Sequence, residues 1–208
     1  MQWTAAILAG GRARRFGGRD KSGLVVDGRS ILDRQLDELA RVTDDILIVR
    51  GAGAPAAGGA PAGGARGGVT VRVVADRVPD CGPLGGLHTA LTESTAGAVA
   101  LVACDMPFVT GPLVAYLVAL AADADIVVPR DERGYHPLCA VYTRACADAV
   151  AGRIAERKLK MSDLFEDVRV RVVTADELDR FGDLRRLLAN VNTEAAFRDL
   201  EALQGHQL

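Results

Sequence analysis

Five cationic side chains lie in a short glycine-rich segment near the amino end of the chain. They are Arg12, Arg14, Arg15, Arg19 and Lys21, interleaved with the pairs Gly10-Gly11 and Gly17-Gly18. Because glycine has no Cβ, backbone N–H groups in such a segment can approach a phosphate closely. Guanidinium and ammonium groups supply the charge that binds it. We therefore predict a triphosphate-binding loop here, the alternative being an exposed basic turn.

Two common phosphate loops do not fit this segment. A P-loop requires glycine directly before its lysine, whereas Asp20 precedes Lys21. The dinucleotide fingerprint requires glycine where Arg12 stands. The sequence therefore disfavours a P-loop enzyme and a dinucleotide-dependent oxidoreductase.

Two aspartates follow segments that are predicted as buried strands. Asp105 comes after the continuously apolar segment 98–104, and Asp76 ends the segment 69–75. Ligands of open parallel sheets bind at the carboxyl edge of the strands, and Mg²⁺ needs only one or two protein carboxylates. Asp105 is thus a candidate Mg²⁺ ligand and Asp76 a candidate nucleotide contact. Either residue could instead form a turn.

Four weaker candidates lie further along the chain. Asn190 and Asn192 are two residues apart, so their amides could serve one ligand or metal together, although asparagines before a helix are often caps. His136 precedes a proline, and Arg157 could hold an acceptor phosphate or belong to a solvated helix face. The sequence shows no convincing His–carboxylate pair.

The elements that must position these residues follow an alternating pattern. Buried strands are predicted at 4–8, 46–49, 69–74, 99–103 and 126–128. Helices are predicted between them, one opened by Ser30 with Ile31, Leu32, Gln35, Leu36 and Leu39 on its inner face, the others over 84–91 and 113–120 after Pro83 and Pro112. This alternation predicts an α/β three-layer sandwich with a mostly parallel sheet.

Outside this core we predict accessory segments of a single domain spanning residues 1–208. Residues 51–68 are almost wholly Gly, Ala and Pro and are interpreted as a mobile surface loop. Residues 168–172 alternate like a half-exposed strand, and 174–177 match a capping box. Thr193 is predicted to open a last amphipathic helix.

Composition limits the classes of protein and of partner. With 49% hydrophobic and 25% charged residues, the 208-residue chain is typical of globular proteins. A formal net charge of -2 argues against nucleic acid or membrane surfaces as partners. Four cysteines without zinc spacing and the lack of a secretory signal favour a reducing cytoplasm.

Taken in order, these motifs resemble those of a known family. The run from Leu8-Ala9-Gly10-Gly11 through 15–18 to Asp20-Lys21 closely resembles the signature of molybdenum cofactor guanylyltransferases. Further segments resemble later motifs of that family, namely Asp76 ahead of 82–87, 104–107, 136–137 and 190–193. Where the family commonly presents an Asn after the second strand, this chain has Arg50, which bears on one contact and on base selectivity.

The resemblance implies a nucleotidyltransferase-like, Rossmann-related fold and transfer of GMP from GTP to the terminal phosphate of molybdenum-bearing molybdopterin, with Mg²⁺. It implies catalytic roles for Arg15 and Lys21, a metal role for Asp105, and nucleotide contacts from Leu8, Ala9, Gly10, Gly11, Lys21, Asp76 and Asp105. Acceptor contacts would come from His136, Arg157, Asn190 and Asn192. A related cytidylyltransferase or a non-catalytic nucleotide-binding protein are the alternatives. Association with other proteins of cofactor synthesis stays open.

Overall fold

The computed structural model describes residues 1–9, 25–26, 29–51, 64–66, 68–191, 193, 195–196 and 198–199. Within these ranges the chain alternates strands and helices, as the sequence predicts. The sheet strands are β1 (Trp3–Ala9), β4 (Asp45–Arg50), β5 (Gly64–Arg66), β6 (Val69–Ala75), β7 (Ala98–Ala103), β8 (Ile126–Asp131), β9 (Gly134–Tyr135), β10 (Cys139–Thr143) and β11 (Val170–Val173). A separate small ribbon pairs β2 (Val25–Val26) with β3 (Arg29–Ser30).

The nine-stranded sheet is mixed but mostly parallel. Its order is β11-β8-β10-β7-β1-β4-β6-β5, with β9 paired to β8. Strand β1 is parallel to β4 and β7, β4 to β6, and β11 to β8. Strand β10 is antiparallel to both of its neighbours, as β5 is to β6 and β9 to β8. Six strands therefore run in one direction, and β5, β9 and β10 run in the other.

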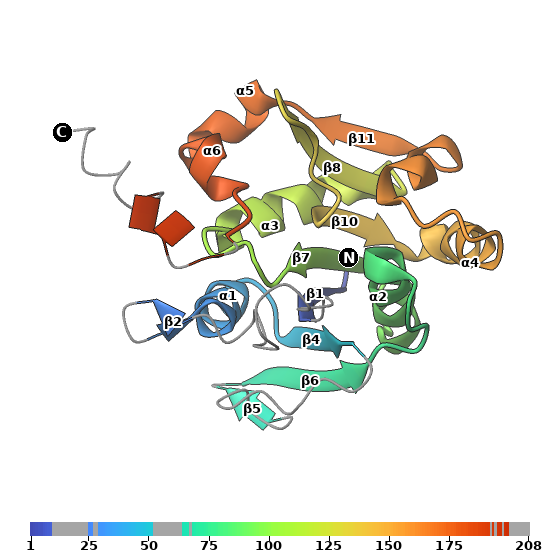
Figure 1. The fold of residues 1–208 in the computed structure, drawn as a ribbon, viewed down its shortest axis with the longest axis horizontal. Coiled ribbons are helices and arrows are strands. Elements are labelled where there is room, and N and C mark those ends of the chain that lie inside the picture. The colour runs from blue at the N-terminus through green and yellow to red at the C-terminus, as the bar shows by residue number, and fades with distance from the viewer. Residues whose placement is uncertain are drawn as a thin grey trace.

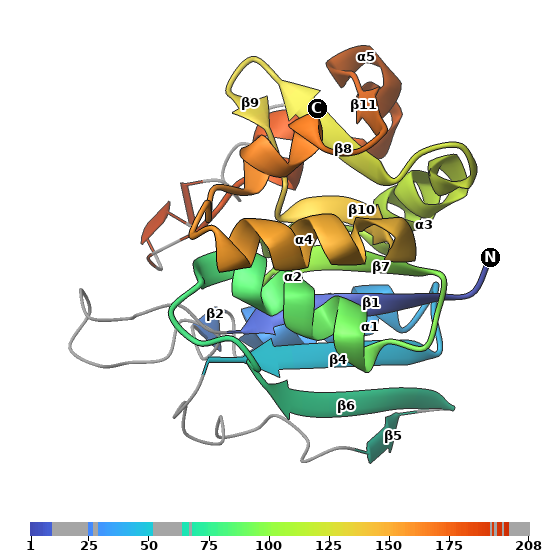
Figure 2. The same ribbon diagram turned by 90° about the vertical axis from the view of Figure 1, so that its right-hand side faces the viewer.

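Helices cover both faces of the sheet, which gives the predicted three layers (Figure 1). The helices α1 (Ile31–Leu39), α3 (Gly111–Ala119), α5 (Ala175–Leu178) and α6 (Leu184–Leu187) share one apolar core, and α2 (Gly82–Glu93) and α4 (Ala147–Ala155) share the other. Figure 2 shows α2 and α4 lying side by side across their face. Successive side chains of a strand point to opposite faces, so Ala5 and Ile7 enter the first core and Ala6 the second.

Local sequence signals account for several helix boundaries. The Ser30 side chain caps α1 by accepting a hydrogen bond from the Asp33 N–H at 3.0 Å, as predicted. Thr174 and Glu177 form the predicted capping box at α5. Thr193 Oγ1 accepts from the Ala196 N–H, consistent with its predicted cap, while the remainder of that helix lies largely outside the described residues.

Five strands in the described residues were not expected from the sequence, namely the two-residue strands β2, β3 and β9 and two longer ones. The first of the longer ones, β10, lies between β7 and β8, and its five residues are all buried. The second, β5, falls inside the segment predicted as a loop, so that prediction is wrong at Gly64–Arg66, where the backbone pairs with β6. Residues 52–63 lie outside the described part of the chain.

All four cysteines are buried free thiols. No helix in the described ranges is both long and apolar enough to cross a membrane.

Candidate active site

The candidate site lies where the parallel strands end. Strands β1, β4 and β6 run side by side with their carboxyl ends at one edge (Figure 2). Pairing puts Ala9 opposite Arg50, Arg50 opposite Ala75, and Leu8 opposite Ala103. The sheet order reverses between β1 and β7, which is where open α/β sheets bind their ligands.

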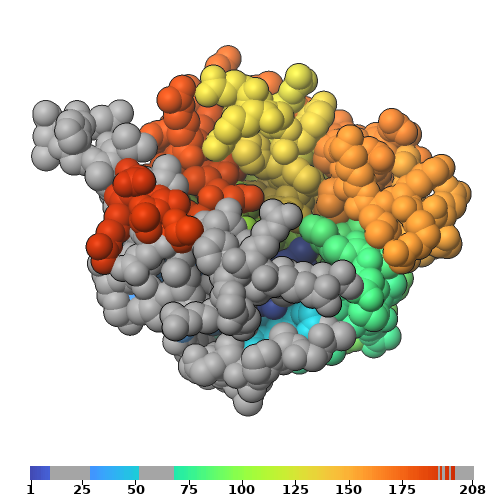
Figure 3. Space-filling model, in the orientation of Figure 1, coloured from blue at the N-terminus to red at the C-terminus, as the bar shows by residue number. Residues whose placement is uncertain are grey.

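Figure 3 looks onto this edge. The ends of β1, in dark blue, and β4, in cyan, are visible at its centre. Green residues of α2 and further orange and yellow residues border them above and to the right. Segments far apart in sequence therefore converge on the end of β1.

Asp105 lies in a turn after β7 that is hydrogen-bonded to the end of β1 and to the segment around Val191. The Cys104 N–H donates to the Leu8 carbonyl at 3.1 Å, and the Met106 N–H donates to the Ala103 carbonyl at 3.2 Å. The Val191 N–H donates to the carbonyl of Asp105 itself at 2.7 Å. The half-buried Asp105 is thus fixed between the end of β1 and the segment that carries Asn190.

Helix α1 holds both ends of this turn with side chains. Gln35 Nε2 donates to the carbonyls of Ala103 at 2.7 Å and Met106 at 3.0 Å. Glu38 Oε2 accepts from the Gly111 N–H at 3.0 Å and so caps α3 in place of Thr110, whose side chain makes no cap hydrogen bond. The sequence placed Gln35 on the inner face of α1 but gave no signal of this role.

Asp76 has a structural partner within its own loop. Its Oδ1 accepts from the Val78 N–H at 3.0 Å and from Thr89 Oγ1 at 2.8 Å. Thr89 is fully buried on α2, and its Oγ1 also accepts from the Arg77 N–H. Asp76 is therefore both the turn former that the sequence allowed and a carboxylate at the predicted edge.

Two glycines bring the start of α2 close to this edge. A Cβ on Gly86 would lie 2.8 Å from Leu8 Cδ2, and a Cβ on Gly85 would lie 2.5 Å from the Val78 carbonyl oxygen. Either contact is shorter than real Cβ atoms show. The glycines let α2 pack directly on the end of β1 and on the Asp76 loop.

Arg157 lies beside the same loop. It follows α4 in a left-handed conformation with φ +59°, and its Nη1 lies 3.6 Å from the Sγ of buried Cys81, which precedes α2. The exposed Arg157 therefore does not belong to a helix face, and its cation lies next to the second glycine motif.

His136 does have a carboxylate neighbour, which corrects the sequence interpretation. Its Nε2 lies 3.0 Å from Asp131 Oδ1, with side-chain exposures of 14% and 7%. Burial alone would raise the pKa of Asp131, but hydrogen bonds from Arg133 and His136 outweigh it and lower the pKa to about 2. Asp131, ionised near neutral pH, thus holds the imidazole in place.

The His136 turn is fixed on both sides. The His136 N–H donates to the Pro129 carbonyl at 2.9 Å, and the buried Tyr142 hydroxyl donates to the Pro137 carbonyl at 2.7 Å.

Several predicted site residues cannot be placed. Gly10, Gly11, Arg15, Lys21 and Asn192 lie outside the described residues. Leu8 and Ala9 end β1, as predicted for the start of the nucleotide loop, and Asn190 is exposed next to the Val191–Asp105 hydrogen bond.

The donor set suits a metal shared with a nucleotide. The described residues contain no group of three or more His, Cys, Asp or Glu side chains that could hold an ion by themselves. Mg²⁺ commonly takes one or two carboxylates and completes its shell with phosphate oxygens and water. Asp105, a hard oxygen donor at the ligand edge, fits that arrangement.

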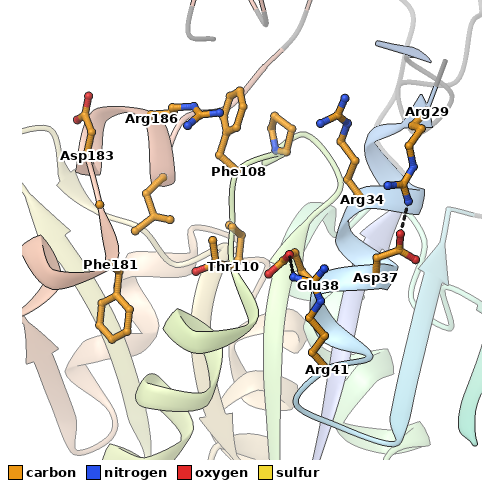
Figure 4. Close-up of a pocket in the computed structure, with 14 residues that line it drawn as sticks. Arg29, Arg34, Asp37, Glu38, Arg41, Phe108, Thr110, Phe181, Asp183 and Arg186 are labelled. Carbon is orange, nitrogen blue, oxygen red and sulfur yellow. Dashed lines mark hydrogen bonds and ion pairs between the residues drawn. The ribbon is translucent and has the colours of Figure 1, made fainter. Parts of the chain in front are cut away.

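A groove of about 510 Å³ flanks the Asp105 turn on the α1 side (Figure 4). Residues 107–110 form its back wall, α1 one side and residues 181–187 the other. Arg29 and Arg41 pair with Asp37 and Glu38, while the Arg186 guanidinium lies over the Phe108 ring at 4.3 Å. None of the predicted site residues that the structure describes lines this groove.

A sheet that reverses order beside β1, with a carboxylate after β7 and glycine-assisted packing of α2, defines an open-sheet α/β protein whose ligand edge lies at the end of β1. Comparison with known proteins gives the family. The MobA-like NTP transferase domain matches residues 5–177, and the chain belongs to this family.

Relatives of similar length support the assignment. A probable molybdenum cofactor guanylyltransferase of Pelotomaculum thermopropionicum is 35% identical over 193 residues, 93% of this chain and 89% of the relative. The molybdenum cofactor guanylyltransferase of Desulfosudis oleivorans is 29% identical over 200 residues, 96% of this chain and 94% of the relative.

Solved structures show the same fold. Molybdopterin-guanine dinucleotide biosynthesis protein A from Archaeoglobus fulgidus superposes with a TM-score of 0.75 at 21% identity, covering 97% of this chain and 98% of that one. The 2-C-methyl-D-erythritol 4-phosphate cytidylyltransferase of Thermus thermophilus gives 0.67 at 17% identity, with 98% of each chain covered.

Proposed function

We propose that this nucleotidyltransferase moves GMP from GTP to the terminal phosphate of molybdenum-bearing molybdopterin, releasing pyrophosphate and forming the guanine dinucleotide. The named activity of the relatives supports this choice of substrates. The observation that carries the proposal is the position of Asp105, which is tied through Cys104 to the end of β1, where the predicted nucleotide loop begins. The cytoplasm is the proposed compartment, and the four free cysteines support a reducing environment.

The chemistry requires placement more than proton transfer. A terminal phosphate has a second pKa of about 6, so the acceptor is mostly ionised near neutral pH and needs no general base. The loop from Leu8 to Gly11 would hold the triphosphate, and Asp76 the nucleoside. Arg15 and Lys21 would neutralise the charge that develops on the leaving pyrophosphate. Catalysis would then come from orientation and charge stabilisation.

Mg²⁺ is the proposed metal, and Asp105 its protein ligand. When bound, the ion would neutralise phosphate oxygens and help to orient the nucleotide. On the acceptor side we place His136, Arg157, Asn190 and Asn192. The Asp131–His136 pair supports the first of these, because an imidazole that a carboxylate already holds in place loses little side-chain freedom when an acceptor binds beside it.

The direct test supplies purified protein with Mg²⁺, molybdenum-bearing molybdopterin and either GTP or CTP. We expect pyrophosphate release and a guanine dinucleotide product, detected by mass, with GTP only. A cytidine product would move the assignment to a cytidylyltransferase. Tight GTP binding without pyrophosphate release in the presence of the acceptor would instead indicate a non-catalytic nucleotide-binding protein.

A further inference from the structure

A primary amide lies in the apolar layer between α1 and the sheet. Gln35 is only 2% exposed, and its neighbours on the inner face of α1 are Leu32, Leu36 and Leu39. In the described part of the chain its Oε1 accepts no hydrogen bond. Burying an amide in such surroundings costs free energy unless hydrogen bonds offset it. The two hydrogen bonds that Gln35 Nε2 donates therefore offset part of this cost, and their acceptors indicate the role of the residue.

Both bonds go to carbonyls that bracket Asp105. Nε2 donates to Ala103, two residues before the aspartate, and to Met106, one residue after it. One side-chain nitrogen thus joins the last residue of β7 to the far side of the turn. The backbone of Asp105 is held from the other direction by the Val191 N–H.

Fixing the backbone on both sides of a residue restricts the side-chain rotamers that it can adopt. A carboxylate that already points in one direction loses less entropy when it binds a cation. Residues that orient metal ligands without touching the metal commonly change metal affinity about 10- to 100-fold when they are replaced.

We propose that Gln35 is a positioning residue for Asp105, and that its two hydrogen bonds set the affinity of the site for the divalent cation of the nucleotide complex. The inference rests on the metal role of Asp105 in the proposed function. Gln35 itself is covered by the core and would contact neither nucleotide nor acceptor. It also couples α1, which follows the predicted nucleotide loop, to the metal carboxylate.

The test compares Gln35→Met, which keeps the side-chain length but removes the donor, with Gln35→Asn, which keeps the amide but withdraws it by one methylene. Thr4→Val is the matched control. Thr4 is fully buried at the opposite edge of the sheet, where its hydroxyl bonds Asp45 at 2.6 Å and Ser94 at 2.7 Å. All three variants lose buried hydrogen bonds, but only the Gln35 variants lose them beside Asp105.

Mn²⁺ is the probe, titrated into protein with saturating GTP and no acceptor, with free Mn²⁺ followed by electron paramagnetic resonance. Thermal unfolding of each variant is recorded in parallel. We expect both Gln35 variants to bind Mn²⁺ roughly tenfold or more weakly than wild type, and Thr4→Val to bind it normally despite a comparable loss of thermal stability. If Gln35→Met does not fold, Gln35→Asn decides the comparison.

Unchanged Mn²⁺ affinity in a folded Gln35 variant overturns the inference, as does equal weakening in Thr4→Val. Asp105→Asn is measured beside them. If that variant keeps wild-type Mn²⁺ affinity, the metal role of Asp105 and the inference fall together. If the Asp105 and Gln35 variants both weaken Mn²⁺ but no GMP reaches molybdopterin, the inference stands and the transferase assignment fails.

Discussion

At the scale of single residues, the site depends on carboxylates whose surroundings differ. Asp105 is half-buried, and its backbone is fixed by strands, a helix and the carboxyl-terminal segment. One oxygen of Asp76 already accepts hydrogen bonds from the Val78 N–H and the Thr89 hydroxyl. Asp131 is half-buried and pairs with His136 and Arg133. Of the three, Asp105 is the one that follows a central strand beside β1, which is why the metal prediction is made for it.

Asp105→Asn should preserve the fold and reduce Mg²⁺-dependent turnover. The change is nearly isosteric but removes the negative charge that Mg²⁺ prefers. We expect turnover to fall roughly a hundredfold, and GTP affinity without metal to stay the same or increase. Thermal unfolding, metal-free calorimetry and the Mg²⁺ dependence of turnover are measured on one preparation. An unchanged Mg²⁺ requirement contradicts the metal role, and a collapse of stability would identify a structural turn residue.

Because of Asp131, the free energy of unfolding should fall as the solution is acidified. Its pKa in the folded protein, about 2, lies below the ordinary 3.8. The unfolded chain therefore binds the proton more readily, so the stabilisation is complete above about pH 4 and is lost as the pH falls towards 2. The shift corresponds to about 2 kcal/mol.

Urea unfolding of Asp131→Asn between pH 5 and pH 2.5 checks this prediction. The variant should lose less stability on acidification than wild type does, because the titrating group is gone. Asp123→Asn, at an exposed position in the turn before β8, is the control and should keep the wild-type slope. Parallel pH profiles for wild type and Asp131→Asn would show that other carboxylates cause the acid sensitivity.

At the scale of elements, the contact between α1 and α3 needs a glycine. A Cβ on Gly111 would lie 2.5 Å from the Glu38 carbonyl oxygen and 3.2 Å from Val42 Cγ1. Gly111→Ala should therefore separate the helices and destabilise the protein by about 1–3 kcal/mol. Gly152, within α4, has no atom within 4 Å of its Cβ position, so Gly152→Ala should stabilise by about 0.5–1 kcal/mol. Urea midpoints measure both, and a neutral Gly111→Ala would mean that the helices separate without cost.

Two kinds of element could be predicted from the sequence. Continuous apolar segments indicate buried strands, and capping residues indicate where helices begin. Strand β7 and the Ser30 cap are examples. Strand β5 could not be found, because Gly64–Arg66 pairs through backbone groups that any sequence carries. For β10, the sequence shows buried residues but not the neighbours between which they insert.

The same limit applies within the site. Asp105 was predictable from its place after an apolar strand. The Asp131–His136 pair was not, because it forms only when the β8–β9 turn folds back and sets Asp131 opposite Gly134. Gln35 lies on the inner face of the amphipathic pattern of α1, so the sequence gives no sign of its hydrogen bonds. Those bonds follow only from the position of the Ala103 and Met106 carbonyls in the fold.

At the scale of the whole molecule, the architecture does not select the base. The chain superposes on a cytidylyltransferase almost as completely as on the Archaeoglobus protein. The strand order and the placement of the carboxyl edge are thus shared by proteins that act on different nucleotides. Selectivity must come from side chains at that edge. Arg50 ends β4 there, 7% exposed, opposite Ala9 and Ala75.

We expect GTP to bind at least about tenfold more tightly than CTP or ATP, a difference of about 1.4 kcal/mol. The resemblance of residues 8–11 to the guanylyltransferase signature and the guanylyltransferase relatives motivate this expectation. Calorimetric titration of the three nucleotides, each with Mg²⁺ and without acceptor, measures it. Arg50→Asn, titrated with the same nucleotides, tests whether this buried arginine contributes: a change in the GTP to CTP ratio would assign it a part in selectivity. Equal or tighter CTP binding by wild type would contradict the guanylyl assignment and favour a cytidylyltransferase, a class that shares this fold.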